Sequence, residues 1–257
     1  MILVLDVGNT NTKCGLFKKD GELVQSWRMA TDRDITSDAL GITIYSFFQY
    51  LKLETCCVEK IMISSVIPSL NYTLMHMCRT YFDQTPCMVG PGIKTGINIL
   101  YENPKELGSD RIVNAVGAFS VYGGPVITVD FGTATSYGAI SANGEFLGGV
   151  ICPGLKISAE ALTRNAAKLP HVDIKKPPTV INKTTITCMQ SGIVYGYVGQ
   201  VDYILRKMKH EIGGNVQVIA TGGLADVIAA ETNMIDKIDP LLTLQGLYQI
   251  YKKNFEA

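Results

Sequence analysis

Two aspartates, Asp6 and Asp130, each follow a short apolar run, and each is followed two positions later by a glycine. Hydroxyl side chains come next in both places, and after Gly8 they alternate with amides. The backbone N–H groups of a glycine-containing turn can converge on an anion. A carboxylate beside such a turn can hold Mg²⁺, which prefers one or two carboxylates plus phosphate oxygens. The two turns together predict the binding of a triphosphate such as ATP.

The first turn carries most of the candidate donors. The side chains of Asn9, Thr10, Asn11 and Thr12 suit phosphate oxygens, and Asp6 is placed to hold Mg²⁺ directly or through water. Lys13 could contact a phosphate, but strand alternation could equally turn it outward, and the sequence leaves both open. Each turn alone is more simply explained as a common turn former. Their occurrence in matching contexts favours a function.

The contexts match because the chain repeats itself. Behind each Asp-containing turn lies a second strand-like run, then a tight polar turn (Asp20–Glu22 and Asn143–Glu145), then a third strand. The spacing predicts two domains of like topology, residues 1–120 and 121–240. A closing amphipathic helix within 241–257 is expected to return to the first domain.

Helices and strands alternate after each three-stranded opening. Apolar spacing and turn signals predict helices over 37–53, 68–82, 110–121, 157–167, 187–211 and 241–251, and strands over 60–66, 87–89 and 216–221. A short helix is expected after Gly222 and Gly223, which could give backbone room for ribose or adenine or form a plain turn. This order predicts two α/β domains, each a mixed sheet flanked by helices, with ligands at the strand ends.

Composition narrows the class of protein. Lys+Arg and Asp+Glu both number 23, so no overall positive field attracts nucleic acid or an anionic membrane. The seven cysteines include no C-x-x-C pair, and with three histidines a zinc site or disulfide framework is not expected. No apolar stretch approaches membrane-spanning length, and the chain begins directly with a strand-like run. These features predict a reduced, cytoplasmic protein.

Five motifs in order then give a specific resemblance. They are Asp6–Thr12 (DVGNTNT), Gly108–Arg111 (GSDR), Asp130–Thr135 (DFGTAT), Met189–Gly192 (MQSG) and Ala220–Gly223 (ATGG). From residue 2 to the final helix the chain resembles type III pantothenate kinase, within the acetate and sugar kinase, Hsp70 and actin superfamily. The resemblance implies two ribonuclease H-like domains, each with a mixed five-stranded sheet, and an interdomain cleft. It implies ATP-dependent phosphorylation of pantothenate to 4′-phosphopantothenate, the first step of coenzyme A synthesis.

The resemblance also implies roles for particular residues. The ATP phosphates would contact Asp6, Val7, Gly8, Asn9, Thr10, Asn11, Thr12, Lys13 and Thr133. Pantothenate would contact Tyr101, Gly108, Ser109, Asp110, Arg111 and Thr185, with Asp110 as the catalytic base. Asp130 resembles the ligand of an activating monovalent cation, K⁺ or NH₄⁺. Thr185 would reach the substrate of the partner subunit in a homodimer, and Thr184 competes with it for that contact.

Some of these roles also follow from chemistry, each beside a simpler alternative. A carboxylate near a helix start at residue 110 can accept the proton of an attacking alcohol, and Arg111 can bind a substrate carboxylate in a planar fork. Asp110 could instead be only an N-cap, and Arg111 only a surface ion pair. Tyr101 could be an aromatic at a strand edge. The 187–211 helix is apolar on more than one face, through burial on both sides or through a dimer interface.

Three other functions fit parts of the pattern. Another small-molecule kinase of the superfamily, acting on a sugar or a carboxylic acid, would share the phosphate-binding turns. A non-catalytic regulator would keep the fold but is disfavoured by the presence of Asp6, Asp110, Asp130 and Thr133 together. A filament-forming or chaperone ATPase is disfavoured because 257 residues are few for either and contain no obvious subdomain insertion or substrate-binding tail.

Overall fold

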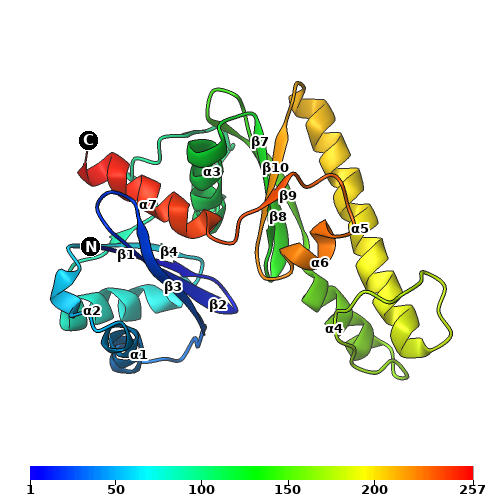
Figure 1. The fold of residues 1–257 in the computed structure, drawn as a ribbon, viewed down its shortest axis with the longest axis horizontal. Helices are drawn as coiled ribbons and strands as arrows, with labels where there is room; N and C mark the ends of the chain where they lie inside the picture. The colour runs from blue at the N-terminus through cyan, green and yellow to red at the C-terminus, as the bar shows by residue number, and fades with distance from the viewer. Residues whose placement is uncertain (257) are drawn as a thin grey trace. The chain divides into compact units, whose positions relative to one another are not determined.

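The computed structural model describes residues 1–256, which divide into two compact units (Figure 1). Unit 1 comprises Met1–Gly96, Asn103–Ser120 and the described part of Thr243–Ala257. Unit 2 comprises Ile97–Glu102 and Val121–Leu242. Within the described chain no helix combines the length and the apolar character needed to cross a membrane.

Unit 1 is built on a five-stranded mixed sheet of order β3-β2-β1-β4-β5. The strands are β1 (Ile2–Val7), β2 (Asn11–Phe17), β3 (Leu23–Ala30), β4 (Lys60–Ser65) and β5 (Cys87–Met88). The central strand β1 pairs antiparallel with β2 and parallel with β4. All six of its residues are buried, as expected for a strand covered on both faces. The edge strand β3 has only partly buried and exposed residues.

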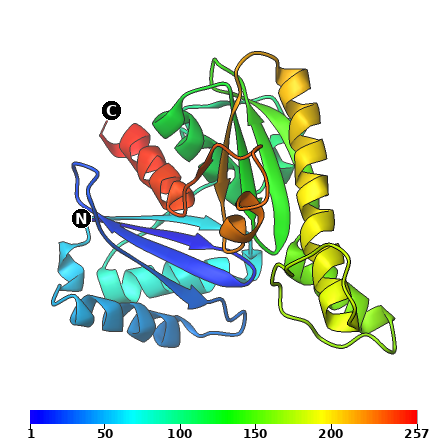
Figure 2. The same ribbon diagram turned by 45° about the vertical axis from the view of Figure 1, so that its right-hand side comes forward.

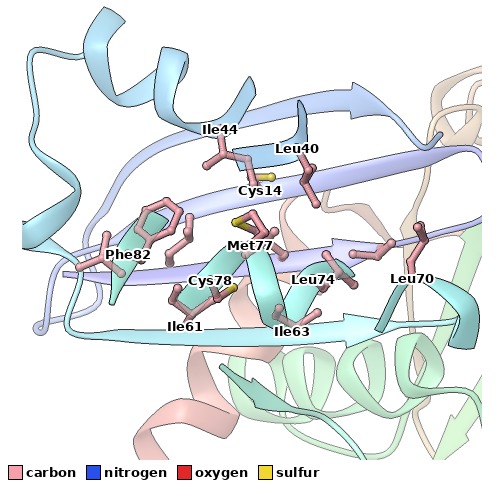
Figure 3. Close-up of a cluster of buried hydrophobic side chains, with 14 of the residues drawn as sticks. Cys14, Leu40, Ile44, Ile61, Ile63, Leu70, Leu74, Met77, Cys78 and Phe82 are labelled. Atoms are coloured by element: carbon pink, nitrogen blue, oxygen red, sulfur yellow. The ribbon is translucent and has the colours of Figure 1, made fainter. Parts of the chain in front are cut away.

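Two helices, α1 (Ser37–Tyr50) and α2 (Asn71–Phe82), cover one face of this sheet. Thr36 caps α1, because its side chain accepts a hydrogen bond from the Ala39 N–H at 3.2 Å. The core below contains alternate residues of β1 and β4 together with apolar residues of both helices (Figure 3). The 3₁₀ turns η1 (Thr55–Cys57) and η2 (Pro68–Leu70) connect these elements.

Helices α3 (Ser109–Tyr122) and α7 (Leu242–Phe255) complete unit 1. In the chain, turn η3 (Pro104–Glu106) precedes α3, and unit 2 precedes α7. The two helices pack so closely that a Cβ added to Gly246 of α7 would lie 2.0 Å from the Val113 carbonyl oxygen of α3. Thr243 donates a buried hydrogen bond of 2.8 Å to the Asn114 side chain. Tyr248 stacks on Phe17 of β2 at a centroid distance of 4.9 Å.

Unit 2 repeats the opening of unit 1 in a six-stranded sheet of order β11-β10-β7-β8-β9-β6. Its strands are β6 (Asn98–Ile99), β7 (Val126–Phe131), β8 (Ala134–Ile140), β9 (Glu145–Pro153), β10 (Gln217–Thr221) and β11 (Lys237–Ile238). As in unit 1, the first long strand, here β7, is antiparallel to its successor and parallel to the strand that follows the helices.

Three helices accompany this sheet: α4 (Leu155–Asn165), the 28-residue α5 (Thr185–Ile212) and the short α6 (Ala225–Ala229). Figures 1 and 2 both show α5 running alongside the sheet. Its buried residues, such as Val198 and Val201, share a core with Ile127 and Val129 of β7. The face of β7 that carries Thr128 and Asp130 is therefore the opposite one.

The structure corrects one feature of the predicted fold. Each sheet was expected to have five strands, but the second has six because β6 joins its edge. The Asn98 N–H donates to the Gly144 carbonyl at 2.9 Å, and the Leu100 N–H donates to the Phe146 carbonyl at 3.0 Å. Residues 97–102 thus lie in unit 2, although the sequence pattern placed them in the first half. A strand of two residues has no periodicity that could reveal it.

Candidate active site

The first candidate turn connects β1 to β2 and begins at Asp6, whose side chain is largely buried at 8% exposure. The Gly8 N–H donates to the Asn11 carbonyl at 3.1 Å, and a Cβ at Gly8 would stand equally close to that oxygen. The turn leaves Asn9, Thr10 and Asn11 exposed at its tip. These three residues are placed to donate to a ligand in solvent.

Two neighbouring residues have positions that the sequence did not define. Lys13 pairs directly with Asp6 across the antiparallel strands, so the two side chains share one face of the sheet. Thr12, in contrast, is buried, and its hydroxyl is hydrogen bonded to the Thr31 hydroxyl at 2.9 Å. Asn9 accepts a hydrogen bond of 2.9 Å from Arg33. The Thr12 side chain therefore stabilises the turn by bonding to Thr31, whereas the Lys13 side chain lies next to Asp6 on the same face of the sheet.

The start of α3 is held at the same edge of the sheet as Asp6. Ser64, the partner of Asp6 in the parallel register of β1 and β4, is fully buried. Its hydroxyl lies 3.0 Å from the Ser109 hydroxyl, and Ser109 also donates to the Ser65 carbonyl at 3.1 Å. The side chain of Ser109 is thus bonded to the protein itself. Asp110, the next residue, is brought to the carboxyl ends of β1 and β4.

The Asp110 carboxylate accepts a hydrogen bond of 2.8 Å from the N–H of Arg111, whose own side chain is buried. Gly108 leaves it room, because a Cβ there would lie 2.5 Å from the Asp110 Oδ1. In the segment Gly108–Arg111, the glycine therefore leaves space, Ser109 holds the segment to β4, and Asp110 and Arg111 supply a carboxylate and a guanidinium.

Replacing Gly108 by Ala is expected to reduce activity far more than stability. The new methyl group collides with the end of a flexible side chain, so the fold is retained while the Asp110 carboxylate is displaced. We expect kcat to fall by about tenfold to a hundredfold, since small misplacements of a reacting group are costly. Steady-state kinetics and thermal melting measure the two effects. Gly90→Ala is the control, because nothing lies within 4 Å of a Cβ there; equal effects of the two variants would contradict the prediction.

The second candidate turn connects β7 to β8 and begins at Asp130. Gly222, which has a φ of +99°, follows β10, and a Cβ on it would lie 2.7 Å from the Asp130 Oδ1 and 2.6 Å from the Phe131 nitrogen. On the other side, the Gly154 N–H donates to the Thr133 carbonyl at 3.2 Å. A Cβ at Gly154 would stand 2.2 Å from that oxygen. Two glycines thus allow close backbone approach on both sides of the turn, while the Thr133 side chain stays exposed.

Sequence reasoning missed a polar cluster that supports this second turn. The Tyr197 hydroxyl of α5 donates to the Pro153 carbonyl at 2.9 Å and is also hydrogen bonded to the Thr135 hydroxyl. Burial raises the pKa of Tyr197, and the thiol of Cys152 nearby adds to that effect. Tyr197 therefore stays neutral and fixes the beginning of β8 to the end of β9. Thr135 is part of the DFGTAT motif, and this motif was the sequence signal from which the cluster could have been found.

Thr184 and Thr185 differ in what their side chains contact. Thr184 caps α5, accepting from the Thr187 N–H at 3.2 Å and lying 2.7 Å from the Thr187 hydroxyl. Thr185 instead borders a pocket of about 610 Å³ formed by α4, α5 and the segment joining them. Its other lining residues are mostly apolar or small and include Leu162, Leu169, Met189, Gly192, Ile193 and Gly196. Both threonines are exposed, and of the two it is Thr185 that lines this pocket.

The sequence-predicted residues do not all lie in one unit. Unit 1 brings together the Asp6–Lys13 turn and Gly108–Arg111, whereas Tyr101, Asp130, Thr133 and Thr185 belong to unit 2. Tyr101 follows β6, with its ring centroid 6.3 Å from that of Phe146.

The donor set of the first turn suits a nucleotide-bound divalent ion. Among residues 1–256, no three His, Cys, Asp or Glu side chains gather as a complete metal-binding group. Mg²⁺ needs only one or two carboxylates when phosphate oxygens and water supply its other ligands. The buried carboxylate of Asp6, beside a turn of exposed donors, fits that requirement. Burial raises the pKa of the Cys14 thiol on β2 to about 12. This cysteine is therefore neutral and is not a nucleophile that competes with a substrate hydroxyl.

Solved structures share this architecture over nearly the whole chain. A Campylobacter jejuni protein assigned to the Baf family of transcriptional activators is 19% identical, with a TM-score of 0.63, and the match covers 99% of this chain and 100% of that one. The activator of 2-hydroxyisocaproyl-CoA dehydratase from Clostridium difficile, solved with bound ADPNP, is 14% identical, with a TM-score of 0.55 and coverages of 97% and 93%. The ethanolamine utilization protein EutJ from Carboxydothermus hydrogenoformans is 11% identical, with a TM-score of 0.55 and coverages of 96% and 89%.

These identities show the fold, which is that of the actin-like ATPases and sugar kinases, and they confirm the predicted fold class. The family follows from a separate match, in which the model of type III pantothenate kinase covers residues 2–207. That range includes both Asp-containing turns and the start of α3. The chain therefore belongs to the type III pantothenate kinase family.

Proposed function

We propose that Asp110 is the general base in the reaction of this family, the phosphorylation of pantothenate by ATP. In that reaction the primary hydroxyl oxygen of pantothenate forms a bond to the γ-phosphorus, and the bond from that phosphorus to the β–γ bridging oxygen breaks, releasing ADP. The hydroxyl proton passes to the Asp110 carboxylate. The observation that supports this proposal is the Ser64–Ser109 contact of 3.0 Å, because Ser64 is the strand partner of Asp6 and Asp110 directly follows Ser109.

Phosphate binding is assigned to the two turns. In unit 1, the exposed tip of the Asp6–Lys13 turn offers backbone and side-chain donors, and Lys13 adds a positive charge on the face of Asp6. In unit 2, Thr133 offers an exposed hydroxyl at the end of a turn closed by Gly154 and Gly222. Asp6 would hold Mg²⁺ directly or through water, and the ion would neutralise charge on the phosphates.

Asp130 is proposed as the ligand of an activating monovalent cation, K⁺ or NH₄⁺. The support is its position at the end of β7, where its carboxylate lies against the Gly222 backbone that follows β10. A monovalent ion suits this position because a single carboxylate neutralises it.

Pantothenate is an anion, and its carboxylate is proposed to bind Arg111, whose planar guanidinium offers paired donors. The N-terminal end of α3 also favours an anionic ligand. Tyr101 and Thr185 are proposed as further substrate contacts. Thr185 would serve the site of the partner subunit in a homodimer, and the exposed side chains of Ile186 and Tyr203 on α5 suit such an association.

All seven cysteines are free, which fits the reducing conditions of the cytoplasm, the proposed location.

The purified protein is expected to release ADP from ATP only when pantothenate is added, with Mg²⁺ and K⁺ present. A coupled ADP assay measures the rate, and mass spectrometry of the product should show one added phosphate. A panel of sugars and small carboxylic acids serves as the control for another kinase of the superfamily. Faster turnover of any of these compounds than of pantothenate would overturn the substrate assignment.

A further inference from the structure

The hydroxyl of Thr221 is an unexplained polar group in unit 2. Thr221 is the last residue of β10, its side chain is 0% exposed, and its Oγ1 has no hydrogen-bond partner in the described chain, residues 1–256. Most buried hydroxyl groups in proteins are hydrogen bonded, and leaving one unsatisfied is costly. Its strand neighbours Val218, Ile219 and Ala220 are apolar. Valine would fill the same space without that cost, so the hydroxyl itself needs an explanation.

The register of the sheet brings this hydroxyl next to Asp130. Thr221 and Asp130 are direct partners in the parallel pair formed by β10 and β7. Paired residues on adjacent strands point to the same face, so the two side chains are neighbours on the face opposite α5. The Asp130 carboxylate also leans toward the end of β10, because its Oδ1 lies 2.7 Å from the point where a Cβ on Gly222 would stand. A carboxylate and an unsatisfied hydroxyl therefore lie on neighbouring strands, side by side on one face at the strand ends.

We propose that the Thr221 hydroxyl oxygen is a ligand of the monovalent cation held by Asp130, an inference that rests on the cation role proposed above for Asp130. Potassium is coordinated in proteins by neutral oxygens that replace its hydration shell. A hydroxyl has two acceptor lone pairs and can serve as such an oxygen. The carboxylate of Asp130 supplies the charge. Coordination of the cation satisfies the hydroxyl and explains why threonine occupies a position suited to valine.

The inference is tested by the response of the protein to K⁺ without nucleotide or pantothenate. The melting temperature is measured as KCl replaces tetramethylammonium chloride at constant ionic strength, because the organic cation is too large for an oxygen-lined site. Wild-type protein is expected to gain stability as K⁺ binds. In Thr221→Val the K⁺ concentration at half-effect should rise by about tenfold or more. Thr221→Ser keeps the hydroxyl and should retain the wild-type midpoint.

A second expected result separates coordination from ordinary packing. Without K⁺, Thr221→Val should melt at the wild-type temperature or above it, since the unsatisfied hydroxyl has been replaced by a methyl group of similar shape. If Thr221→Val does not fold, Thr221→Ala provides the same comparison of midpoints. The K⁺ dependence of the steady-state rate should shift in parallel with the thermal midpoint.

Asp130→Asn distinguishes failure of the cation role proposed for Asp130 from failure of the ligand role proposed for Thr221. If Asp130→Asn abolishes the K⁺ response while Thr221→Val keeps the wild-type midpoint, the cation binds at Asp130 without Thr221 and the inference is overturned. If Asp130→Asn responds to K⁺ as wild type does, the cation role of Asp130 fails, and the inference fails with it. A raised midpoint in Thr221→Val, restored in Thr221→Ser, supports the inference.

Discussion

Asp110→Asn should lower kcat for pantothenate phosphorylation by about 10²–10⁴-fold, the usual contribution of a general base. An amide accepts no proton at neutral pH, yet it has nearly the same shape as the carboxylate. It can still accept the 2.8 Å hydrogen bond from the Arg111 N–H, so the start of α3 is retained. The affinity for ATP should stay unchanged, because the donors proposed for the phosphates lie in the other turns. Single-turnover kinetics and ATP-binding calorimetry measure the two quantities.

Asp38→Asn is the matched control for this variant. Asp38 lies in the first turn of α1 and accepts a hydrogen bond from Tyr81 at 3.1 Å, so the change removes a similar charge from a similar helix end in the same unit. We expect wild-type kcat in that control. Wild-type turnover in Asp110→Asn itself would mean that Asp110 only stabilises the helix end and that another group accepts the proton.

Gly246→Ala should destabilise unit 1 by about 3 kcal/mol, at the upper end of the usual cost of overpacking. The new methyl group would meet the Val113 carbonyl oxygen at 2.0 Å, and a backbone atom cannot move aside without displacing α3. Because α3 begins with the Gly108–Arg111 segment, loss of activity should accompany loss of stability. Urea denaturation, followed by the fluorescence of the single tryptophan, Trp27 on β3 of unit 1, reports on this unit directly.

Gly199→Ala is the control for the same substitution in a helix. Gly199 lies within α5, and a Cβ there meets nothing within 4 Å. This variant should be as stable as wild type, or more stable by about 0.5–1 kcal/mol, because alanine favours the helix. Equal melting behaviour of the two glycine variants would show that α7 can shift away from α3 at little cost.

The sequence was sufficient to predict the parts of the fold that carry strong local signals. The strands before Asp6 and Asp130 are runs that are apolar except for Thr128 and end in turn residues, and the helix over 37–53 has regular apolar spacing. Both are properties of consecutive residues, so both can be recognised without tertiary information. The repeat of the two turns also anticipated that the units share one order of strands.

Other features could not be predicted because they depend on pairing between distant segments. Ser64 gains its position only when β4 pairs with β1, and its bond to Ser109 joins residues 45 positions apart. The hydroxyl of Thr221 is unsatisfied only because β10 is buried beside β7. The ATGG motif directed attention to the glycines that follow Thr221, and only the register relates that residue to Asp130.

The return of α7 to unit 1 has a consequence for biosynthesis. A ribosome makes the chain from the N-terminus onward, and domains can begin to fold as they emerge. All segments of unit 2 precede residue 243, whereas unit 1 still lacks the helix that covers α3 and stacks Tyr248 on Phe17. The unit whose strands are translated first is therefore expected to finish folding last. Until α7 emerges, the apolar surface that it covers is exposed and open to aggregation or chaperone binding.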